Sequence, residues 1–200
     1  MVPINFHQHR DEIRRVLLAK KEALANDWDP FVAAWICYAL AVDGSENNQP
    51  LSELRDRLLG WLETEDAWQY QRNLGPIATT LWLCHKTGQI LKPAIAEQLS
   101  ARVQQLNADE KWSPVRDGEQ VFLLALGFQG TEDDQAKSHL KNIAARQIKR
   151  GPLRRRVLYA AAIRELGESV PCRDNNPQDE GDIIALVWWA ERYGGDKHGQ

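Results

Sequence analysis

Three kinds of feature are scarce in this 200-residue sequence, and each scarcity narrows the class of protein. Cysteine occurs only three times, an odd number that does not suit a disulfide framework and that fits a reducing compartment. The formal net charge is only −3, so we expect no broad electrostatic attraction to nucleic acid. The longest apolar run, FVAAWICYALAV, has twelve residues, whereas a helix that spans a bilayer needs about 20.

Sequence motifs of nucleotide-binding and hydrolytic enzymes are absent as well. The glycines form neither G-x-x-x-x-G-K-[ST] nor G-x-G-x-x-G, and no serine lies in a G-x-S-x-G turn. The first residues, MVPINFHQHRDEIRR, lack the apolar segment of a signal peptide. We therefore expect a cytoplasmic protein that has no cofactor and does not bind a membrane.

What the sequence does contain is an alternation of two kinds of helical segment. Amphipathic segments place apolar residues at steps of three and four, as Leu51, Leu54 and Leu58 do, which gives one apolar stripe per helix. Between them lie segments that are apolar on nearly every side and rich in alanine, a good helix former and a poor strand former. The apolar segments are FVAAWICYALAV, IATTLWLC, VFLLAL, VLYAAAI and IIALVWWA.

Capping residues, prolines and glycines set the expected boundaries of these helices. We predict a single domain over residues 1–200, with mobile tails at 1–6 and 195–200 and a loop at 168–180. The predicted helices are 7–26, 30–43, 51–64, 75–87, 91–107, 117–127, 132–149, 153–166 and 181–193. The residues expected in the interior are Trp35, Trp82, Phe122, Leu158 and Trp188.

A weak internal repeat indicates how these helices are arranged. Trp28, Trp68 and Trp112 each lie between an amphipathic and an apolar segment, at spacings of 40 and 44 residues. A period of this size is typical of stacked helical hairpins. We predict an all-α, two-layer array of antiparallel helical hairpins, either an α-solenoid or an arc like part of an α/α toroid. Over residues 25–195 the pattern resembles the α/α-toroid superfamily of terpenoid cyclases, protein prenyltransferases and lanthionine cyclases, whose catalytic motifs this sequence lacks.

Two short segments, WICYALAVDG and WLCHKTG, raise the question of a metal site. In lanthionine cyclases, zinc is held by a cysteine on one inner helix and by a Cys-His pair near the end of a later one. Cys37 and the pair Cys84-His85 resemble these elements, although Lys86 stands where that family has glycine. Cys37 also lies within an apolar run, where a free cysteine behaves as a small hydrophobic residue. We expect both cysteines to be packing residues, and a zinc site of Cys37, Cys84 and His85 is the alternative that the resemblance implies.

An arginine cluster in IKRGPLRRR is a candidate for partner binding, and it consists of Arg150, Arg154, Arg155 and Arg156. Consecutive arginines at the start of a helix oppose the helix dipole. We therefore expect them to pair either with internal acids in 174–182 or with an external anion, a solvated surface being the remaining interpretation. A second candidate is an aromatic patch formed by Trp189 and Tyr193 near the end of the chain.

The absence of catalytic motifs favours a non-enzymatic helical-repeat domain that binds another protein on the concave surface of its hairpins. The alternative is an α/α-toroid enzyme or apolar-ligand-binding protein, with a pocket lined by the tryptophans and cysteines of the inner helices. That alternative is zinc-dependent if Cys37, Cys84 and His85 bind the metal. A local anionic partner at the arginine cluster is a third interpretation, and nucleic acid is not the expected partner.

Overall fold

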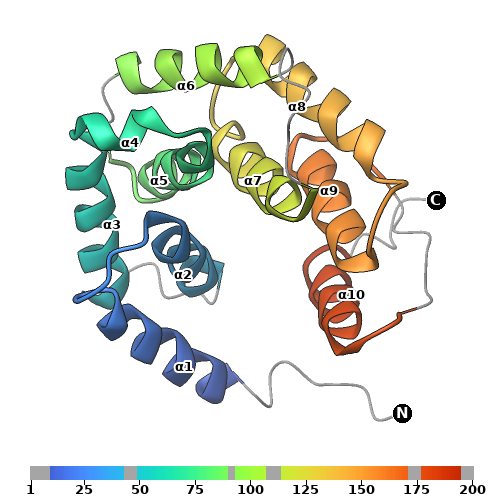
Figure 1. Ribbon diagram of the computed structural model, residues 1–200, viewed down its shortest axis with the longest axis horizontal. Helices are drawn as coiled ribbons and strands as arrows, with labels where there is room; N and C mark the ends of the chain where they lie inside the picture. Colours follow the sequence, from blue (N-terminus) through green and yellow to red (C-terminus); the bar gives the residue numbers. More distant parts are fainter. Residues whose placement is uncertain (1–9, 43–48, 90–92, 107–113, 171–176, 195–200) are drawn as a thin grey trace.

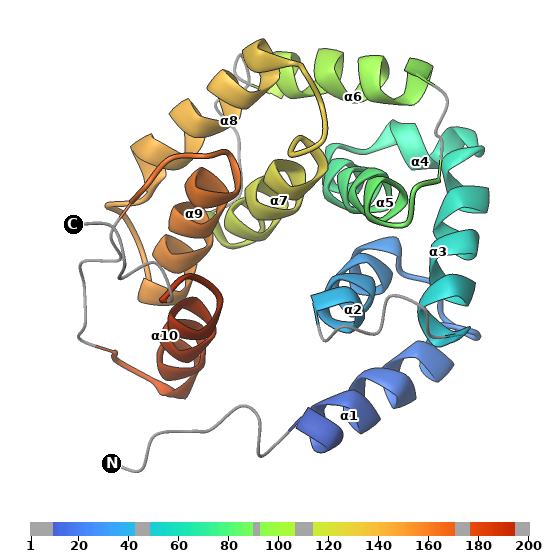
Figure 2. The same cartoon turned by 180° about the vertical axis from the view of Figure 1, so that it is seen from behind.

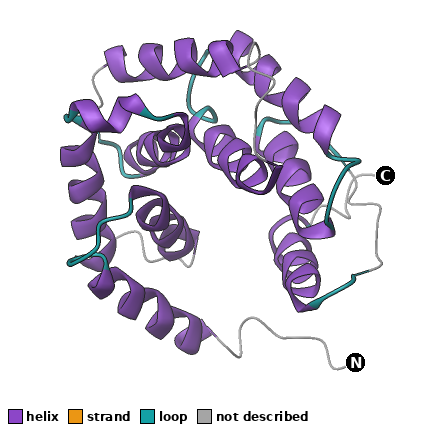
Figure 3. Cartoon of the chain, in the orientation of Figure 1, coloured by secondary structure: helices purple, strands orange, loops and turns teal. Residues whose placement is uncertain are grey.

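The computed structural model describes residues 10–42, 49–89, 93–106, 114–170 and 177–194. Within these ranges the chain forms helices and turns and no strand, which confirms the all-α class (Figure 3). The helices are α1 (Arg10–Ala23), α2 (Pro30–Val42), α3 (Gln49–Leu62), α4 (Glu65–Gln69), the short 3-10 helix η2 (Gln71–Asn73), α5 (Leu74–Lys86), α6 (Pro93–Leu106), α7 (Pro114–Gly127), α8 (Asp134–Gln147), α9 (Leu153–Glu165) and α10 (Glu180–Tyr193). All nine predicted helices are present, and the prediction lacked only the short helices α4 and η2.

The helices lie in two layers that follow an open arc (Figures 1 and 2). The outer layer contains α1, α3, α6 and α8, and the inner layer contains α2, α5, α7, α9 and α10. In both views the outer helices are seen along their length and the inner helices closer to end-on, so the outer helices lie across the inner ones. The arc is open between α1 and α10, the first and last helices of the chain.

Neighbouring inner helices from α5 to α10 run in the same direction. A Cβ atom added at Gly75 would lie 3.2 Å from Leu123 Cδ1, and one added at Gly127 would lie 2.6 Å from Ala78 Cβ, so α5 and α7 advance together. Between α7 and α9, Gly118 lies against Arg155 near the start of both helices. Gln129, just after α7, donates a hydrogen bond from its side chain to Glu165 at the end of α9. Each outer helix therefore has to carry the chain back to the start of the next inner helix.

The described part of the connection between α9 and α10 contains no outer helix. Asp182 at the start of α10 accepts a hydrogen bond from the backbone N–H of Arg154 at the start of α9 (3.1 Å). Arg192 at the end of α10 bonds Glu165 at the end of α9, so these two helices are parallel as well. The two ends of the connection 166–179 are therefore separated by about the length of α9, roughly 20 Å for the thirteen residues of that helix. Its described residues, 166–170 and 177–179, contain turns and irregular segments and no helix. The predicted loop at 168–180 stays a prediction, because residues 171–176 lie outside the described ranges and Glu180 already belongs to α10.

Burial follows the two kinds of segment that the sequence contains. In α5, every residue from Leu74 to Cys84 is buried, which explains why that helix is apolar on all sides. Of the residues predicted to be interior, Trp82 and Phe122 are buried, whereas Trp35, Leu158 and Trp188 are half-buried.

The tryptophan spacing that suggested a repeat stays a prediction. Trp28 is half-buried in the segment between α1 and α2, Trp68 is half-buried in α4, and Trp112 lies outside the described residues. Residues 1–6 and 195–200, predicted to be tails, are outside them too.

Gly127 should be the most sensitive glycine at the contact between α5 and α7. We expect Gly127→Ala to lower the free energy of unfolding by roughly 1–3 kcal/mol, because the new methyl group would lie 2.6 Å from the carbonyl oxygen of Ala78. Gly60→Ala in α3 is the matched control, since no atom lies within 4 Å of its added Cβ and alanine stabilises a helix by about 0.5–1 kcal/mol over glycine. Urea denaturation measures both changes, and equal effects would contradict the close contact.

Candidate interaction surfaces

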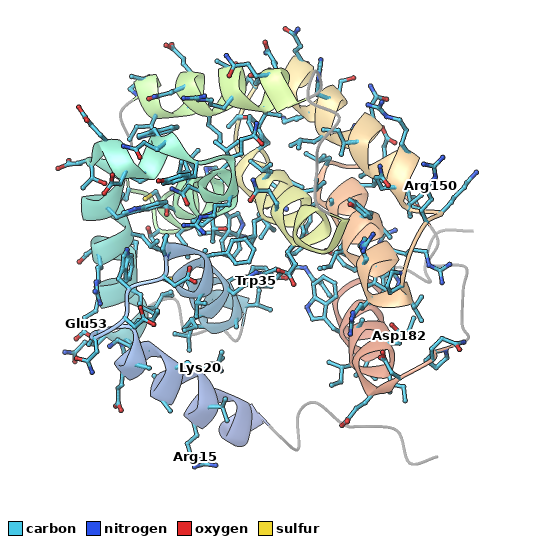
Figure 4. The ribbon with its side chains drawn as sticks, in the orientation of Figure 1. Arg15, Lys20, Trp35, Glu53, Arg150 and Asp182 are labelled. Atoms are coloured by element: carbon cyan, nitrogen blue, oxygen red, sulfur yellow. The ribbon has the colours of Figure 1, made fainter. Side chains whose placement is uncertain are left out.

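An aromatic cluster connects the two ends of the inner layer. The ring of Trp35 on α2 is stacked on Phe122 of α7, with 5.8 Å between ring centroids and 14° between ring planes. Trp188 on α10 meets the same phenyl ring edge-on at 5.4 Å. In Figure 4, Trp35 lies on the inner side of the arc. Because α2 and α10 share Phe122, aromatic contacts fix how far apart the two ends of the inner layer stand.

Glu165 is the centre of a polar network at the end of α10. Its Oε1 accepts hydrogen bonds from Arg192 Nη2 (2.7 Å), Arg192 Nε (2.9 Å) and the Tyr193 hydroxyl (2.5 Å). Its Oε2 accepts one from Gln129 Nε2. The Glu165 side chain is only 7% exposed, so the guanidinium supplies the positive charge that a buried carboxylate requires.

Tyr38 on α2 contacts this network through Arg192. The guanidinium carbon of Arg192 lies 5.4 Å from the centre of the Tyr38 ring, a cation–π contact. The Tyr38 side chain is buried. Burial raises the pKa of Tyr38 above its ordinary range, while the charge of Arg192 opposes that rise. The hydroxyl therefore stays protonated at neutral pH and is not a ready base or nucleophile.

The start of α10 is held by a second set of polar contacts. Asp182 is buried, and its Oδ2 accepts a hydrogen bond from the backbone N–H of Gln178 (3.0 Å), while its Oδ1 caps α9 at Arg154. Asp179 caps α10 itself by accepting from the backbone N–H of Asp182 (2.9 Å). Figure 4 shows Asp182 where α10 approaches α9. Helix α10 is thus fixed to α9 near both of its ends.

The four arginines of the cluster do not share one surface. Arg154 Nη1 lies 3.9 Å from the carboxylate of Asp179, so one arginine pairs with an acid of the range 174–182. The side chain of Arg155 lies against Gly118 and Gly151, and its Nε is buried without a hydrogen-bond partner among the described residues. Arg150 lies at the outer surface (Figure 4), and Arg156 is half-buried. The predicted binding of an external anion by this cluster stays a prediction.

The cysteines and the histidine proposed for zinc face different surroundings. Cys37 and Cys84 are fully buried, whereas His85 is exposed and its ring lies against Gly130. Burial raises the pKa of the Cys37 thiol to about 12 and that of Cys84 to about 11, which disfavours the thiolate that zinc requires. Over the described ranges, no group of three His, Cys, Asp or Glu side chains is placed to hold a metal ion.

Comparisons with protein-family models, curated proteins and solved structures gave no match. The resemblance to the α/α-toroid superfamily accordingly stays an expectation, and function has to be argued from the side chains of this chain. Among the described helices, none is long and apolar enough to cross a membrane.

Most of the exposed large apolar side chains lie on the helices that border the open side of the arc. Val16 on α1, Val32 and Val42 on α2 and Ile184 on α10 are each between 37% and 48% exposed. Among the described residues, the other such side chain is Tyr70, which is 54% exposed and lies between α4 and η2. We call the surface formed by α1, α2 and α10 the open edge, and it is the strongest candidate for an interaction surface.

On α2 these residues belong to one stripe. Val32, Trp35, Ala39 and Val42 recur at steps of three, four and three, and all four are partly or fully exposed. The opposite face of the helix is buried against its neighbours. The spacing was visible in the sequence, but the apolar residues around it concealed which face lacks a neighbour.

Helix α10 is less covered than the other inner helices. Among its described side chains only Asp182 is buried, although its middle, IIALVWWA, is apolar throughout. The predicted patch residues Trp189 and Tyr193 are half-buried and lie against each other, with ring centroids 4.7 Å apart. They pack on the aromatic cluster, so the large apolar side chain that α10 exposes is Ile184 instead.

Arg192 should be the most important arginine for stability. We expect Arg192→Ala to lower the free energy of unfolding by about 3 kcal/mol, because it leaves the buried carboxylate of Glu165 without a counter-charge. Arg154→Ala is the control, since its pair with Asp179 spans 3.9 Å between two exposed side chains and should contribute less than about 1 kcal/mol. Urea denaturation compares the two variants, and similar losses would show that the Glu165 network is not a buried one.

The buried thiols should make stability depend on alkaline pH. The folded chain keeps the protons of Cys37 and Cys84 well above the unfolded pKa of 9.0, so this contribution is fully present below pH 9.0 and is lost as the pH rises. Between about pH 8 and about pH 10, the free energy of unfolding of the wild type should fall by about 1 kcal/mol per thiol more than that of the Cys37→Ala/Cys84→Ala variant.

A chelator should leave the melting temperature of the wild type unchanged if both cysteines only pack. A clear fall in melting temperature on chelation would support the zinc alternative, because the free energy of metal binding appears as folding free energy.

Proposed function

We propose that this chain is a non-enzymatic helical interaction domain that binds a protein partner at its open edge. The proposal is supported above all by the distribution of exposed apolar side chains, since Val16, Val32, Val42 and Ile184 lie on the three helices at that edge. Single exposed apolar residues are common on any protein, but four on the helices that border the opening of the arc make a surface that a partner can cover.

The stripe on α2 indicates that the partner contributes a helix. Side chains at alternating steps of three and four line up along one face of a helix and fit between the side chains of a second helix. Trp35 lies in the middle of the stripe and is half-buried, so a partner would contact an indole already held by Phe122. Rigid aromatic side chains of this kind contribute much of the free energy at protein interfaces.

The alternative of an enzyme or apolar-ligand pocket has less support from the side chains. Burial raises the pKa of Cys37, Cys84 and Tyr38, which places the nucleophilic form of each out of reach near neutral pH. The inner tryptophans and Phe122 pack on one another, as the ring contacts between α2, α7 and α10 show.

Affinity capture with matched variants tests the proposal. A tagged chain is used to capture proteins from the native host, which also produces the untagged chain, and bound proteins are identified by mass spectrometry. We expect a partner that the wild type and Tyr70→Arg capture and that Val32→Arg and Ile184→Arg lose by at least about tenfold, because each places a charge in the apolar contact.

Tyr70→Arg is the matched control because Tyr70 is an exposed large side chain between α4 and η2, on none of the three helices of the open edge. Circular dichroism and thermal melting establish that all variants fold. A partner retained equally by all four proteins, or no specific capture by the wild type, would contradict the proposed function.

A further inference from the structure

We infer that the partner at the open edge is a second copy of this chain, arranged so that α1 of each copy covers α10 of the other. This inference rests on the proposed function and specifies the occupant of the same surface. Three observations carry it: the order of the layers, the matching apolar faces and the opposite charges of the two helices.

Among the described helices, the order of the layers leaves α10 without an outer helix that covers it. Along the chain, outer and inner helices alternate from α1 to α9, and α10 then follows α9 as a second inner helix (Figures 1 and 2). Helix α9 is covered by α8, whereas α10 has its main contacts with α9. The first described helix is therefore an outer helix, and the last described helix is an inner one. A second copy supplies, through its α1, the kind of helix that α10 lacks.

The two helices present apolar residues at compatible spacings. On α1, Val16, Ala19 and Ala23 recur at steps of three and four and are all exposed. On α10, Ile184 is exposed and Val187, three residues later, is partly exposed. Small residues such as alanine let two helix axes approach closely, so the larger side chains of α10 fit over the alanines of α1. A helix as apolar as α10 gains most from being covered on this side.

The charges of the two helices are opposite. Helix α1, RDEIRRVLLAKKEA, has five basic and three acidic residues, and α10, EGDIIALVWWAERY, has three acidic residues and one basic residue. Lys20 on α1 and Glu180 on α10 are both exposed. Contact between α1 and α10 therefore joins a basic helix to an acidic one, whereas contact between two α10 helices would join like charges.

A single two-fold axis produces both contacts at once. Figure 1 shows α1 and α10 on the same side of the arc, one at each end of the opening. Rotation by half a turn about an axis along the direction of view places α1 of each copy opposite α10 of the other. Two-fold dimers are the commonest oligomers, and such an interface leaves no unpaired end from which a filament could grow.

Oligomeric state is the first test, measured by sedimentation equilibrium on the full chain. We expect the wild type and Tyr70→Arg to be dimers, and Val16→Arg and Ile184→Arg to have dimer dissociation constants raised by at least about tenfold. Val16 and Ile184 lie on different helices, so a common effect requires that both α1 and α10 are in the interface. A monomeric wild type, or dimers that neither substitution weakens, would overturn the inference.

Mixing two charge variants tests the pairing of α1 with α10. Lys20→Glu alone and Glu180→Lys alone should each weaken the dimer, because like charges then face each other twice. A mixture of the two variants should form a heterodimer with an affinity near that of the wild type, since both interfaces then pair opposite charges. Native mass spectrometry counts the species, and a mixture no tighter than the separate variants would refute the α1–α10 pairing.

The outcomes separate this inference from the proposed function. If the wild type is monomeric yet captures a different protein in a way that depends on Val32 and Ile184, the proposed function stands and the second copy is wrong. If the wild type is neither dimeric nor selective in capture, both are wrong. Thermal melting of each variant identifies any that lose the dimer only by unfolding.

Discussion

Close contact between parallel inner helices is the constraint on which the rest of this structure depends. Gly127 brings α7 against the backbone of α5 at Ala78, and Gly118 makes room for Arg155 between α7 and α9. Inner helices in such contact need neighbours on most sides, so the outer helices have to cross over them to complete the coverage. Among the described helices, this crossing of outer over inner helices extends from α1 to α9. The arc is therefore open, and no outer helix covers α10.

The sequence was sufficient to predict the helices and their two kinds, because burial and amphipathic spacing are local patterns. It was insufficient for α4 and η2, since neither is long enough to show a period. The sequence also did not predict the relative directions of the helices. That α9 and α10 are parallel depends on Asp182 meeting Arg154 and on Arg192 meeting Glu165, contacts between residues that are 28 and 27 positions apart.

Residue type alone was a poor guide to the candidate surfaces. Cys84 and His85 are adjacent in the sequence, yet the end of α5 leaves one buried and the other against Gly130 at the surface. Arg154 and Arg155 are adjacent too, but one faces α10 and the other α7. Conversely, Glu165 showed no local signal of its importance, because its partners Gln129 and Arg192 come from other segments.

Because α10 is attached mainly to α9, the free energy needed to expose a helix to solvent differs between α10 and α5. Residues of α5 are enclosed on all sides, so exposing them to solvent requires most of the domain to unfold. Helix α10 is secured by Asp182 at one end and Arg192 at the other, with a partly exposed apolar middle. It can therefore separate as a unit, at a lower free energy than global unfolding, and the backbone amides of α10 exchange their hydrogens with solvent sooner than those of α5.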